Sequence, residues 1–314
     1  MSIQKMIPLS KNLWDAVSNV TVDDVKETLE ANGVPVKQLR IFNSGWDSFV
    51  YLLNETQIVQ IAKRKNVAVR IREEIKFLKL LQGRFGVDVP MYNLVMECNL
   101  AGGLLVSYTF IKGNAISVHD STSLKAIIEV VKFCSEFHKI SKKNDINLSN
   151  SVDLKVFHQE AIEAQKVISD HLSSAENYLL DRVMNINIKT SEPVKVCIHN
   201  DLRPAHILQN DSQIGVIDWK DLAWAMPWLD FLWLWIYWGD SIYPILSSCY
   251  QDWNSSWEKN IAVVGLWKCA LEYCYGLQTN DTEKIRIAKF ALNHVLTEPG
   301  HPIYRQFYSG NACL

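Results

Sequence analysis

Residues 194–208 read V-K-V-C-I-H-N-D-L-R-P-A-H-I-L, and residues 214–230 read I-G-V-I-D-W-K-D-L-A-W-A-M-P-W-L-D. Each segment begins with a run rich in β-branched residues, and such runs predict short buried strands. Each run ends at a loop that carries an acidic residue, Asp201 in the first segment and Asp218 in the second. The two segments therefore predict a pair of strand ends that present carboxylates.

Two carboxylates placed in this way suit phosphoryl transfer from a nucleotide. One can orient the attacking hydroxyl and accept its proton, while the other holds the Mg²⁺ that bridges the phosphates. His206 follows shortly after Asp201, and a neutral imidazole can bind a divalent cation or orient its water. Either aspartate alone is equally consistent with an ordinary loop residue, so the hypothesis depends on the combination.

The same residues resemble the aminoglycoside phosphotransferase and choline kinase-like superfamily. Its pattern, H-G-D-x-x-x-x-N followed by I-D-(W/F), corresponds here to H-N-D-L-R-P-A-H and I-D-W. The H-N-D and the final His are most similar to the aminoglycoside 2″-phosphotransferases. The resemblance implies an α+β, protein-kinase-like, two-lobed fold, with a small β-rich, nucleotide-binding N-lobe at 1–110. A larger, mainly helical C-lobe at 111–314 would carry the catalytic loop and the acceptor-binding helices.

The resemblance also implies roles for single residues. Asp201 would be the catalytic aspartate, His206 and Asp218 the metal ligands, and Asp230 a buried carboxylate that supports the catalytic loop. ATP or GTP with Mg²⁺ would be the cofactors. The sequence departs from the superfamily at residues 225–226, where Ala-Met replaces the usual Gly-Asp.

A predicted hairpin at 39–53 has its first turn at Ser44 and Gly45. A glycine in this turn lets the backbone approach a phosphate, and Ser44 and Ser48 add donors. A plain β-turn explains the glycine equally well, but superfamily members carry a similar loop over the nucleotide. The resemblance therefore implies that Ser44, Gly45 and Ser48 contact the cofactor.

The next strand and helix carry the residues that would hold the phosphates. In kinases this strand supplies a lysine to the phosphates and the helix supplies a glutamate that positions the lysine. Glu74 matches the glutamate, in a helix predicted at 67–81. Gln60 stands where the lysine is expected, and Lys63 is the next basic residue, on the opposite face if the strand is regular. Either residue could contact the phosphates, and Lys63 could instead be a surface lysine.

The segment 104–113 is a further predicted strand, and it resembles the part of the superfamily that links the lobes. Backbone groups around Tyr108 and Phe110 would then pair with the purine. Because backbone groups do not depend on residue type, the sequence does not indicate whether the purine is adenine or guanine. In the predicted helix at 124–140, we interpret His138 as a core histidine with its hydrogen bonds satisfied.

The acceptor site is the least defined part of the sequence. Most of the tryptophans lie between 224 and 267, with carboxylates among them, and we expect most of these rings to fill a helical core, including a buried helix at 222–238. Aromatic walls with a few carboxylates can also bind a cationic or sugar-like acceptor. The acceptor-binding candidates are Asp221, Trp238, Asp240 and Glu272.

Composition limits the function classes. A net charge of -2 provides no field for nucleic acid, and seven scattered cysteines fit a reducing compartment better than a disulfide framework. No run is long and apolar enough to predict a membrane span or a signal peptide. We therefore expect a cytoplasmic enzyme whose partners are a nucleotide and a small molecule, with no nucleic acid, membrane or protein partner implied.

The resulting hypothesis is a small-molecule kinase that transfers the γ-phosphate of ATP or GTP to a hydroxyl of an aminoglycoside-type antibiotic, with a role in antibiotic resistance. One alternative is a metabolic kinase of choline, a sugar or an amino alcohol. Another is a catalytically weak nucleotide-binding protein, which Gln60 and His206 would suit. A protein kinase is disfavoured, because the full glycine-rich loop and the D-F-G and A-P-E motifs are absent from the sequence.

Overall fold

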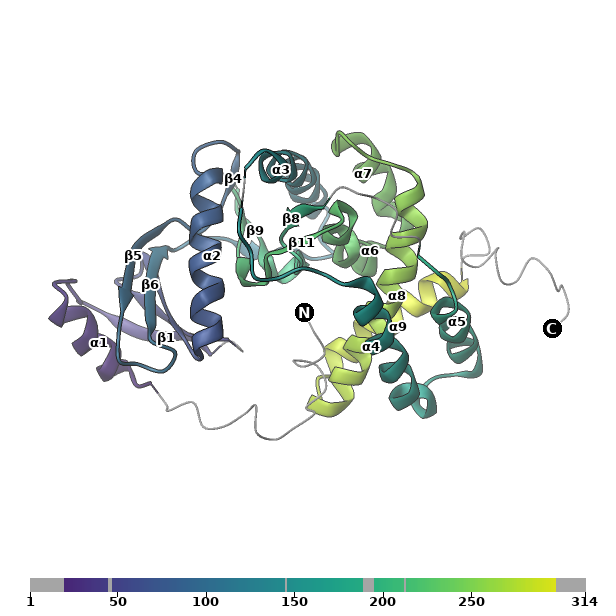
Figure 1. Cartoon of the computed structure of the whole chain (residues 1–314), viewed down its shortest axis with the longest axis horizontal. Coiled ribbons are helices and arrows are strands. Elements are labelled where there is room, and N and C mark those ends of the chain that lie inside the picture. The colour runs from purple at the N-terminus through teal and green to yellow at the C-terminus, as the bar shows by residue number, and fades with distance from the viewer. Residues whose placement is uncertain (1–19, 45–46, 145, 189–194, 212, 298–314) are drawn as a thin grey trace, which may run out of the picture.

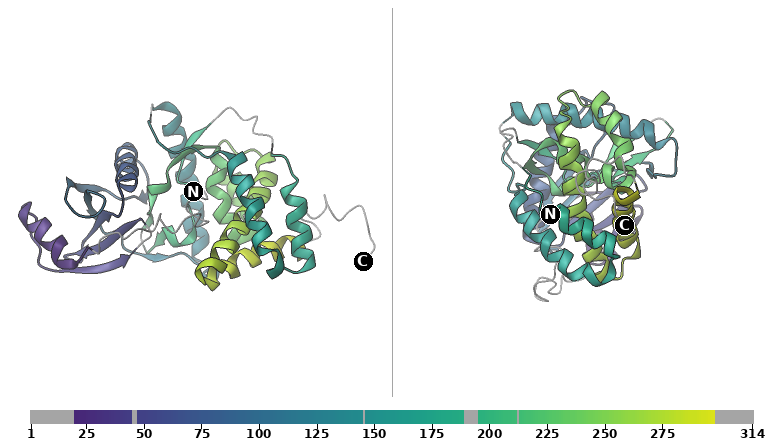
Figure 2. Two further views of the ribbon diagram at one scale, coloured as in Figure 1. Left: turned by 60° about the horizontal axis from the view of Figure 1, so that its bottom comes forward. Right: turned by 90° about the vertical axis from the view of Figure 1, so that its right-hand side faces the viewer.

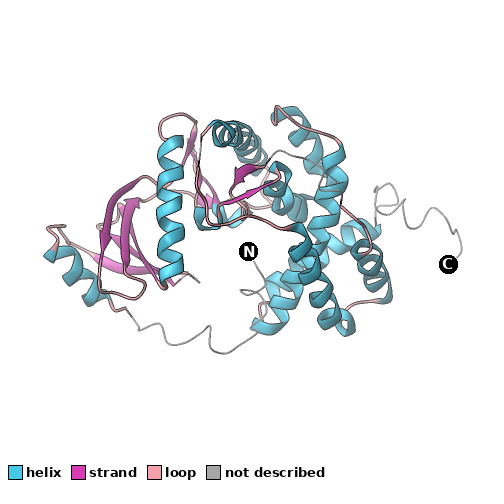
Figure 3. Ribbon diagram, in the orientation of Figure 1, coloured by secondary structure: helices cyan, strands magenta, loops and turns pink. Residues whose placement is uncertain are grey.

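The computed structural model describes residues 20–44, 47–144, 146–188, 195–211 and 213–297. A β-rich part occupies one end of the molecule and a helical part the other, and Figures 1 and 3 show this division clearly. The left view in Figure 2 shows the same order of the two parts along the long axis. This is the α+β architecture expected from the sequence.

The β-rich part is built on one antiparallel sheet. Its strands, in spatial order, are β1 (Leu39–Ser44), β2 (Ser48–Leu53), β3 (Gln57–Ala62), β6 (Leu104–Thr109) and β5 (Tyr92–Glu97). They are rich in β-branched and aromatic residues, which pack well on a pleated surface. Because side chains alternate between the faces of a strand, the sheet has two apolar faces to cover.

One helix covers each face of this sheet. Helix α1 (Val22–Ala31) begins at a capping box between Thr21 and Asp24 and buries Val25 and Leu29 against strands β2 and β3. Helix α2 (Lys65–Leu81) covers the other face, where its apolar residues pack against Ala62 of β3. The α2 face is the one that turns toward the helical part of the molecule (Figure 1).

The helical part contains seven α-helices among the described residues. They are α3 (Ser123–Lys143), α4 (Leu154–Ile168), α5 (Ser174–Met184), α6 (Leu232–Trp238), α7 (Tyr243–Cys249), α8 (Ser256–Thr279) and α9 (Thr282–Thr297). Helix α8 is buried on nearly all sides, which explains why its apolar residues show no one-sided pattern. Within the ranges described, every helix is too short or too polar to cross a membrane.

Two small sheets lie between the large sheet and the helices. One contains β4 (Val87–Asp88), β10 (Ile214–Val216), β9 (Ile207–Gln209) and β7 (Asn114–Ala115), and the other contains β11 (Ala223–Ala225) and β8 (Val196–Ile198). The expected strands at 194–198 and 214–217 form as β8 and β10, although residue 194 lies outside the described residues, and the two strands end near the middle of the molecule.

Two elements of the expected N-lobe, β4 and α2, pack against the expected C-lobe. Strand β4 lies within the expected N-lobe but pairs in parallel with β10. The end of α2, through Phe77, Leu78 and Leu81, packs into the main core of the helical part. The division at 110 remains a prediction, since α2 and β4 connect the two parts.

The buried helix expected at 222–238 is wrong in its first half. Residues Ala223–Ala225 form β11, which pairs with β8, and a 3-10 helix, η6 (Pro227–Phe231), follows before α6 begins. Pro227 cannot continue a helical hydrogen-bond ladder from the preceding turn, and the open edge of β8 offers the segment strand pairing instead. The tryptophan-rich pattern predicted burial correctly but not the secondary structure.

Candidate active site

The loop that follows β8 presents Asp201. Asn200 has a positive φ of 67°, a left-handed conformation that glycine and asparagine adopt most readily. This conformation explains why asparagine can stand where the superfamily pattern has glycine. His199 is buried and holds the loop from inside: it accepts a hydrogen bond from the Asp201 N–H at 3.3 Å, and its Nε2 lies 3.0 Å from the carbonyl oxygen of Ile217.

The buried carboxylate of Asp230 holds this loop in place through hydrogen bonds. It is fully buried and accepts hydrogen bonds from the N–H of His199 at 3.0 Å and the N–H of Asn200 at 2.7 Å. His138 Nε2 lies 2.9 Å from the same carboxylate, and His138 Nδ1 lies 3.0 Å from the Tyr250 hydroxyl. The supporting role expected for Asp230 and the satisfied core role expected for His138 are both confirmed.

His206 connects the two aspartates. It ends a short 3-10 helix, η4 (Pro204–His206), and its Nδ1 lies 2.8 Å from the carbonyl oxygen of Asp201. Because a carbonyl can only accept, Nδ1 carries the proton. Nε2 then has the lone pair, which agrees with the hydrogen bond that Arg203 Nε donates to it at 3.2 Å. Nε2 also lies 3.4 Å from Oδ2 of Asp218.

Asp218 lies directly after β10 in another left-handed turn, with φ of 66°. Its Oδ1 is 3.0 Å from Lys220 Nζ. Burial by itself would raise the pKa of Asp218, but the charge of Lys220 and its hydrogen bond to the carboxylate outweigh burial and hold that pKa well below its ordinary value. Asp218 is therefore ionised at neutral pH, as a cation ligand must be.

These side chains fit a divalent cation held in the manner of Mg²⁺. Within the described ranges, no group of three or more His, Cys, Asp and Glu side chains forms a complete metal site. Mg²⁺ usually takes one or two protein carboxylates and completes its shell with waters and substrate phosphates. The Asp218 carboxylate beside the His206 lone pair matches that incomplete, phosphate-dependent kind of site.

The opposite wall of the site is the α2 face of the large sheet. The register pairs Ser48 with Ala62 and Val50 with Gln60, which places Ser48 and Gln60 on one face. Three buried polar atoms here have no hydrogen-bond partner among the described residues: Ser48 Oγ, Gln60 Oε1 and Glu74 Oε2. Since buried polar atoms are normally satisfied, such a group indicates a surface that receives a polar ligand.

Glu74 projects from α2 into this wall. Its Oε1 accepts a hydrogen bond from the Tyr92 hydroxyl at 2.7 Å. Burial raises the pKa of Glu74 to about 8, against the opposing effects of the Tyr92 hydrogen bond and the charge of Lys220. A carboxyl in this state is mostly protonated at neutral pH.

The two residues that could replace the missing lysine of β3 point to different sides of the sheet. Lys63 Nζ lies 4.7 Å from the centre of the Phe49 ring, and Phe49 packs with the cluster beneath α1. Gln60 lies on the α2 side with Glu74. The alternation expected from the sequence is confirmed, while contact of either residue with phosphates remains a prediction.

The other expected nucleotide contacts are only partly described. Gly45 lies outside the described residues, and of Ser44 only the backbone is described, as the last residue of β1. Tyr108 lies in β6 between β3 and β5, and the N–H of Phe110 donates to the Thr56 carbonyl at 2.9 Å. That N–H is used within the protein, so a purine would need other backbone groups of this segment.

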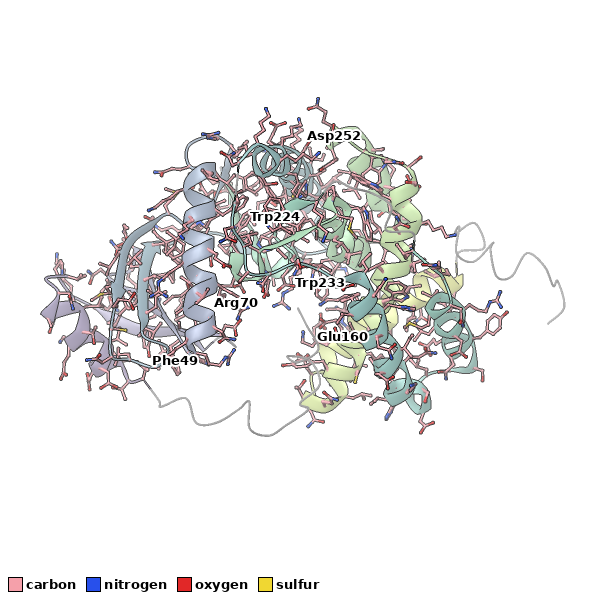
Figure 4. All side chains as sticks on the ribbon, in the orientation of Figure 1. Phe49, Arg70, Glu160, Trp224, Trp233 and Asp252 are labelled. Carbon is pink, nitrogen blue, oxygen red and sulfur yellow. The ribbon has the colours of Figure 1, made fainter. Side chains whose placement is uncertain are left out.

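A cavity of about 610 Å³ opens beside the catalytic loop. Figure 4 labels Arg70 on α2, Glu160 on α4 and Trp233 on α6, and all three line this cavity. Its remaining lining mixes apolar and polar side chains and comes from the same helices, from α8, from the loop before α4, from the loop after β8 and from the segment 221–229. Further lining residues include Asn200, Asp221, Phe157, Leu232 and Lys268.

Of the four expected acceptor-binding residues, only Asp221 lines this cavity. Glu272 is buried and paired with Lys268 at 3.1 Å and Lys284 at 2.8 Å, so its charge is already balanced. Asp240 accepts a hydrogen bond from the Trp235 indole at 2.9 Å, and its N–H donates to His294. Asp240 therefore holds the end of α6 in place, and Trp238, at that same end, is likewise absent from the lining.

The structure adds residues that the sequence pattern did not single out. Arg70 is buried and bridges Asp47 at 3.0 Å and Asp221 at 3.1 Å, which links the loop before β2 to the loop after Asp218. Arg64 is paired with Asp47 as well. The sequence shows these charges, but they are far apart in the chain and only the packing brings them together.

The comparisons with known proteins agree with this geometry. A family model described as the phosphotransferase enzyme family matches residues 38–254. A search among curated proteins finds no match.

Similar solved structures include the GDP complex of wild-type aminoglycoside 2'-phosphotransferase-IIIa, with 16% identity, coverage of 87% of this chain and 99% of that chain, and a TM-score of 0.69. The GDP and kanamycin complex of an APH(2") enzyme has 18% identity, coverage of 87% and 98%, and a TM-score of 0.68. The macrolide 2'-phosphotransferase from Brachybacterium faecium has 18% identity, coverage of 86% and 98%, and a TM-score of 0.61. At these identities the structures show the fold, and they confirm the expected kinase-like one.

Proposed function

We propose that this chain transfers the γ-phosphate of ATP or GTP to a small molecule, with aminoglycoside-type antibiotics as the first candidate acceptors. The chain belongs to the phosphotransferase enzyme family and is a phosphotransferase that acts on hydroxyl groups. Similar structures hold GDP, and one of them holds GDP with kanamycin. These complexes support a nucleotide and an aminoglycoside as ligands to test for this chain.

The proposal rests on the contacts that connect Asp201, His206 and Asp218. A continuous set of contacts joins Asp201 through its own carbonyl to His206 Nδ1 at 2.8 Å, and His206 Nε2 to Asp218 at 3.4 Å. The acidic group that would act on the acceptor and the ligands that would hold a phosphate-bound cation are therefore fixed relative to each other. In kinases, such positioning supplies most of the catalytic effect.

The reaction follows from this arrangement. Asp201 orients the acceptor hydroxyl and receives its proton as the new bond to the γ-phosphorus forms and the bond from that phosphorus to the bridging oxygen breaks. Asp218 and His206 would hold Mg²⁺, which would supply positive charge to the phosphate oxygens when bound. Asp230 keeps the loop rigid through its two backbone hydrogen bonds.

A macrolide-like acceptor is the second candidate, because the three carboxylates that line the cavity, Asp153, Glu160 and Asp221, are accompanied by two cations, Arg70 and Lys268. Lys268 lines the cavity and its Nζ lies 5.0 Å from the centre of the Trp233 ring. Arg70 balances Asp221 at 3.1 Å. A polycationic acceptor gains most from carboxylates without such partners, whereas a large acceptor with few charges would use the apolar lining.

The test is a mass-spectrometric search for a phosphorylated product. The protein would be incubated with Mg²⁺, ATP or GTP and pooled aminoglycosides, macrolides, choline, sugars and amino alcohols, with Asp201→Asn in parallel. We expect one acceptor class to gain a phosphoryl group with the wild-type protein and not with the variant. Nucleotide binding without any product, or a product formed equally by Asp201→Asn, would contradict the proposal.

A further inference from the structure

The wall that faces the nucleotide phosphates lacks a lysine where kinases have one. Protein kinases place a β3 lysine between the phosphates and a helix glutamate. Here Gln60 occupies that face of β3, and its amide can contribute no positive charge. Lys63 is directed to Phe49 on the other side of the sheet. The glutamate is nevertheless present, buried, and has an unpartnered Oε2.

A different lysine enters the same space from the opposite wall. Lys220 lies in the 3-10 helix η5 (Trp219–Asp221), which follows the left-handed turn at Asp218. The ion pair between Asp221 and Arg70 fixes η5 against α2 at 3.1 Å. Since α2 also carries Glu74, this packing brings Lys220 beneath the helix that supplies the glutamate.

The ammonium group of Lys220 lies beside the metal-site aspartate. Its side chain is only 12% exposed, and Nζ is 3.0 Å from Oδ1 of Asp218. Its charge opposes the effect of burial, which raises the pKa of Glu74. Lys220 therefore lies beside the metal-site aspartate, in a 3-10 helix that is paired with the helix of Glu74 through Asp221 and Arg70.

A lysine ammonium has three donors, and the contact with Asp218 accounts for one of them. Two donors are thus available for further acceptors in a region where Gln60 Oε1 and Glu74 Oε2 have no partner among the described residues. Phosphate oxygens are acceptors of the same kind with more charge. A buried lysine in this position has the chemistry that the missing β3 lysine would supply.

We infer that Lys220 is the residue that binds the nucleotide phosphates in this protein, in place of the lysine that β3 lacks at Gln60. This inference rests on the proposed nucleotide-dependent function, and it assigns to the loop after Asp218 a role that belongs to the sheet in kinases. It also explains how the protein can be active with glutamine at position 60.

The test compares diphosphates with nucleosides. Binding of ADP and GDP, and of adenosine and guanosine, would be measured by isothermal titration calorimetry with Mg²⁺. For Lys220→Met we expect the preferred diphosphate to bind about 10-fold to 100-fold more weakly, as for the loss of one or two hydrogen bonds to a charged group, with nucleoside binding unchanged. Lys76→Met, which removes an exposed lysine of α2, is the matched control and should bind like the wild type.

The outcomes separate the inference from the proposed function. If the wild-type protein binds no nucleotide, both fail. If Lys220→Met binds the diphosphate as tightly as the wild type, or if Lys63→Met loses more affinity than Lys220→Met, only the inference fails. Unchanged nucleoside binding in Lys220→Met excludes misfolding as the cause of a loss.

A relocated lysine provides a second, independent test. In the double variant Gln60→Lys with Lys220→Met, a lysine returns to β3 beside Glu74. We expect this variant to recover diphosphate binding to within about 3-fold of the wild type, a difference below 1 kcal/mol. The double variant decides the question even if Lys220→Met alone does not fold, because continued loss of diphosphate binding by a folded double variant would overturn the inference.

Discussion

The two walls of the site are built in opposite ways. The catalytic wall, formed by Asp201, His206, Asp218 and Asp230, comes from one short stretch of sequence and its groups are joined by direct hydrogen bonds and close contacts. The phosphate wall, formed by Gln60 and Glu74, has unpartnered buried atoms and receives its cation, Lys220, from the other wall. The groups of the catalytic wall follow one another along one stretch of the chain, whereas the groups of the phosphate wall come together only through the packing of distant segments.

Asp218 belongs to both walls, so its loss should have the largest effect. We expect Asp218→Ala to reduce phosphoryl transfer by at least about 10³-fold, because it removes the cation ligand and the partner of Lys220 together. Steady-state kinetics across a Mg²⁺ titration would measure this. Retention of a near wild-type kcat would show that the two walls do not meet at Asp218.

Asp230 tests how far the catalytic wall depends on its buried support. Asp230→Asn should lower the free energy of unfolding by about 3 kcal/mol, since the amide cannot accept from His199, Asn200 and His138 as the carboxylate does. Chemical denaturation would measure the change, with the exposed Asp170→Asn as the control. A loss no larger than in the control would show that the catalytic loop does not rely on Asp230.

The connection between the walls can be measured through Arg70. A double-mutant cycle of Arg70→Met and Asp221→Asn should give a coupling energy of about 1 to 3 kcal/mol in thermal or chemical unfolding, because the pair is largely buried. Purely additive effects would mean that α2 and η5 are held together by other contacts, and would weaken the case for the position of Lys220.

The smallest expected effect concerns pH and belongs to the phosphate wall alone. The pKa of Glu74 is raised from 4.5 to about 8 by burial, so the folded state retains a proton that the unfolded state loses. The contribution of Glu74 to the free energy of unfolding should therefore decline as pH rises from about 5 to 8. Glu74→Gln should remove that decline and melt at a higher temperature than the wild type at pH 8.

A difference of at least about 1 kcal/mol at pH 8 is expected, and Tyr92, which donates to Glu74, must remain in both proteins. Thermal melts at several pH values would measure it. Parallel profiles for wild type and Glu74→Gln would mean that Glu74 is ionised in the folded protein.

The difference between the walls also explains what the sequence could predict. Asp201, His206, Asp218 and Asp230 were found because their order along the chain carries the pattern, and strands β8 and β10 place them with little help from distant residues. The position proposed for Lys220 cannot be predicted from the sequence, because it depends on the packing of η5 against α2 through Asp221 and Arg70, which are far apart in the chain.

The acceptor site shows the same limit. Asp240 and Glu272 have the residue type that a cationic acceptor needs, but the fold uses Asp240 to hold a helix end and pairs Glu272 with two lysines. A carboxylate in sequence does not reveal whether its charge is already balanced. The lining of the cavity, which includes Lys268 and Trp233, follows only from how α6 and α8 pack.

Asp201 is proposed to act directly in acceptor-dependent phosphoryl transfer. The most direct measurement is the rate of nucleoside diphosphate release with Mg²⁺, ATP or GTP and the acceptor pool, for wild type, Asp201→Asn and Asp170→Asn. We predict release that depends on acceptor, is unchanged in Asp170→Asn and falls by at least about 10²-fold in Asp201→Asn, while nucleotide affinity is retained. Acceptor-dependent release at the wild-type rate in Asp201→Asn would contradict the claim.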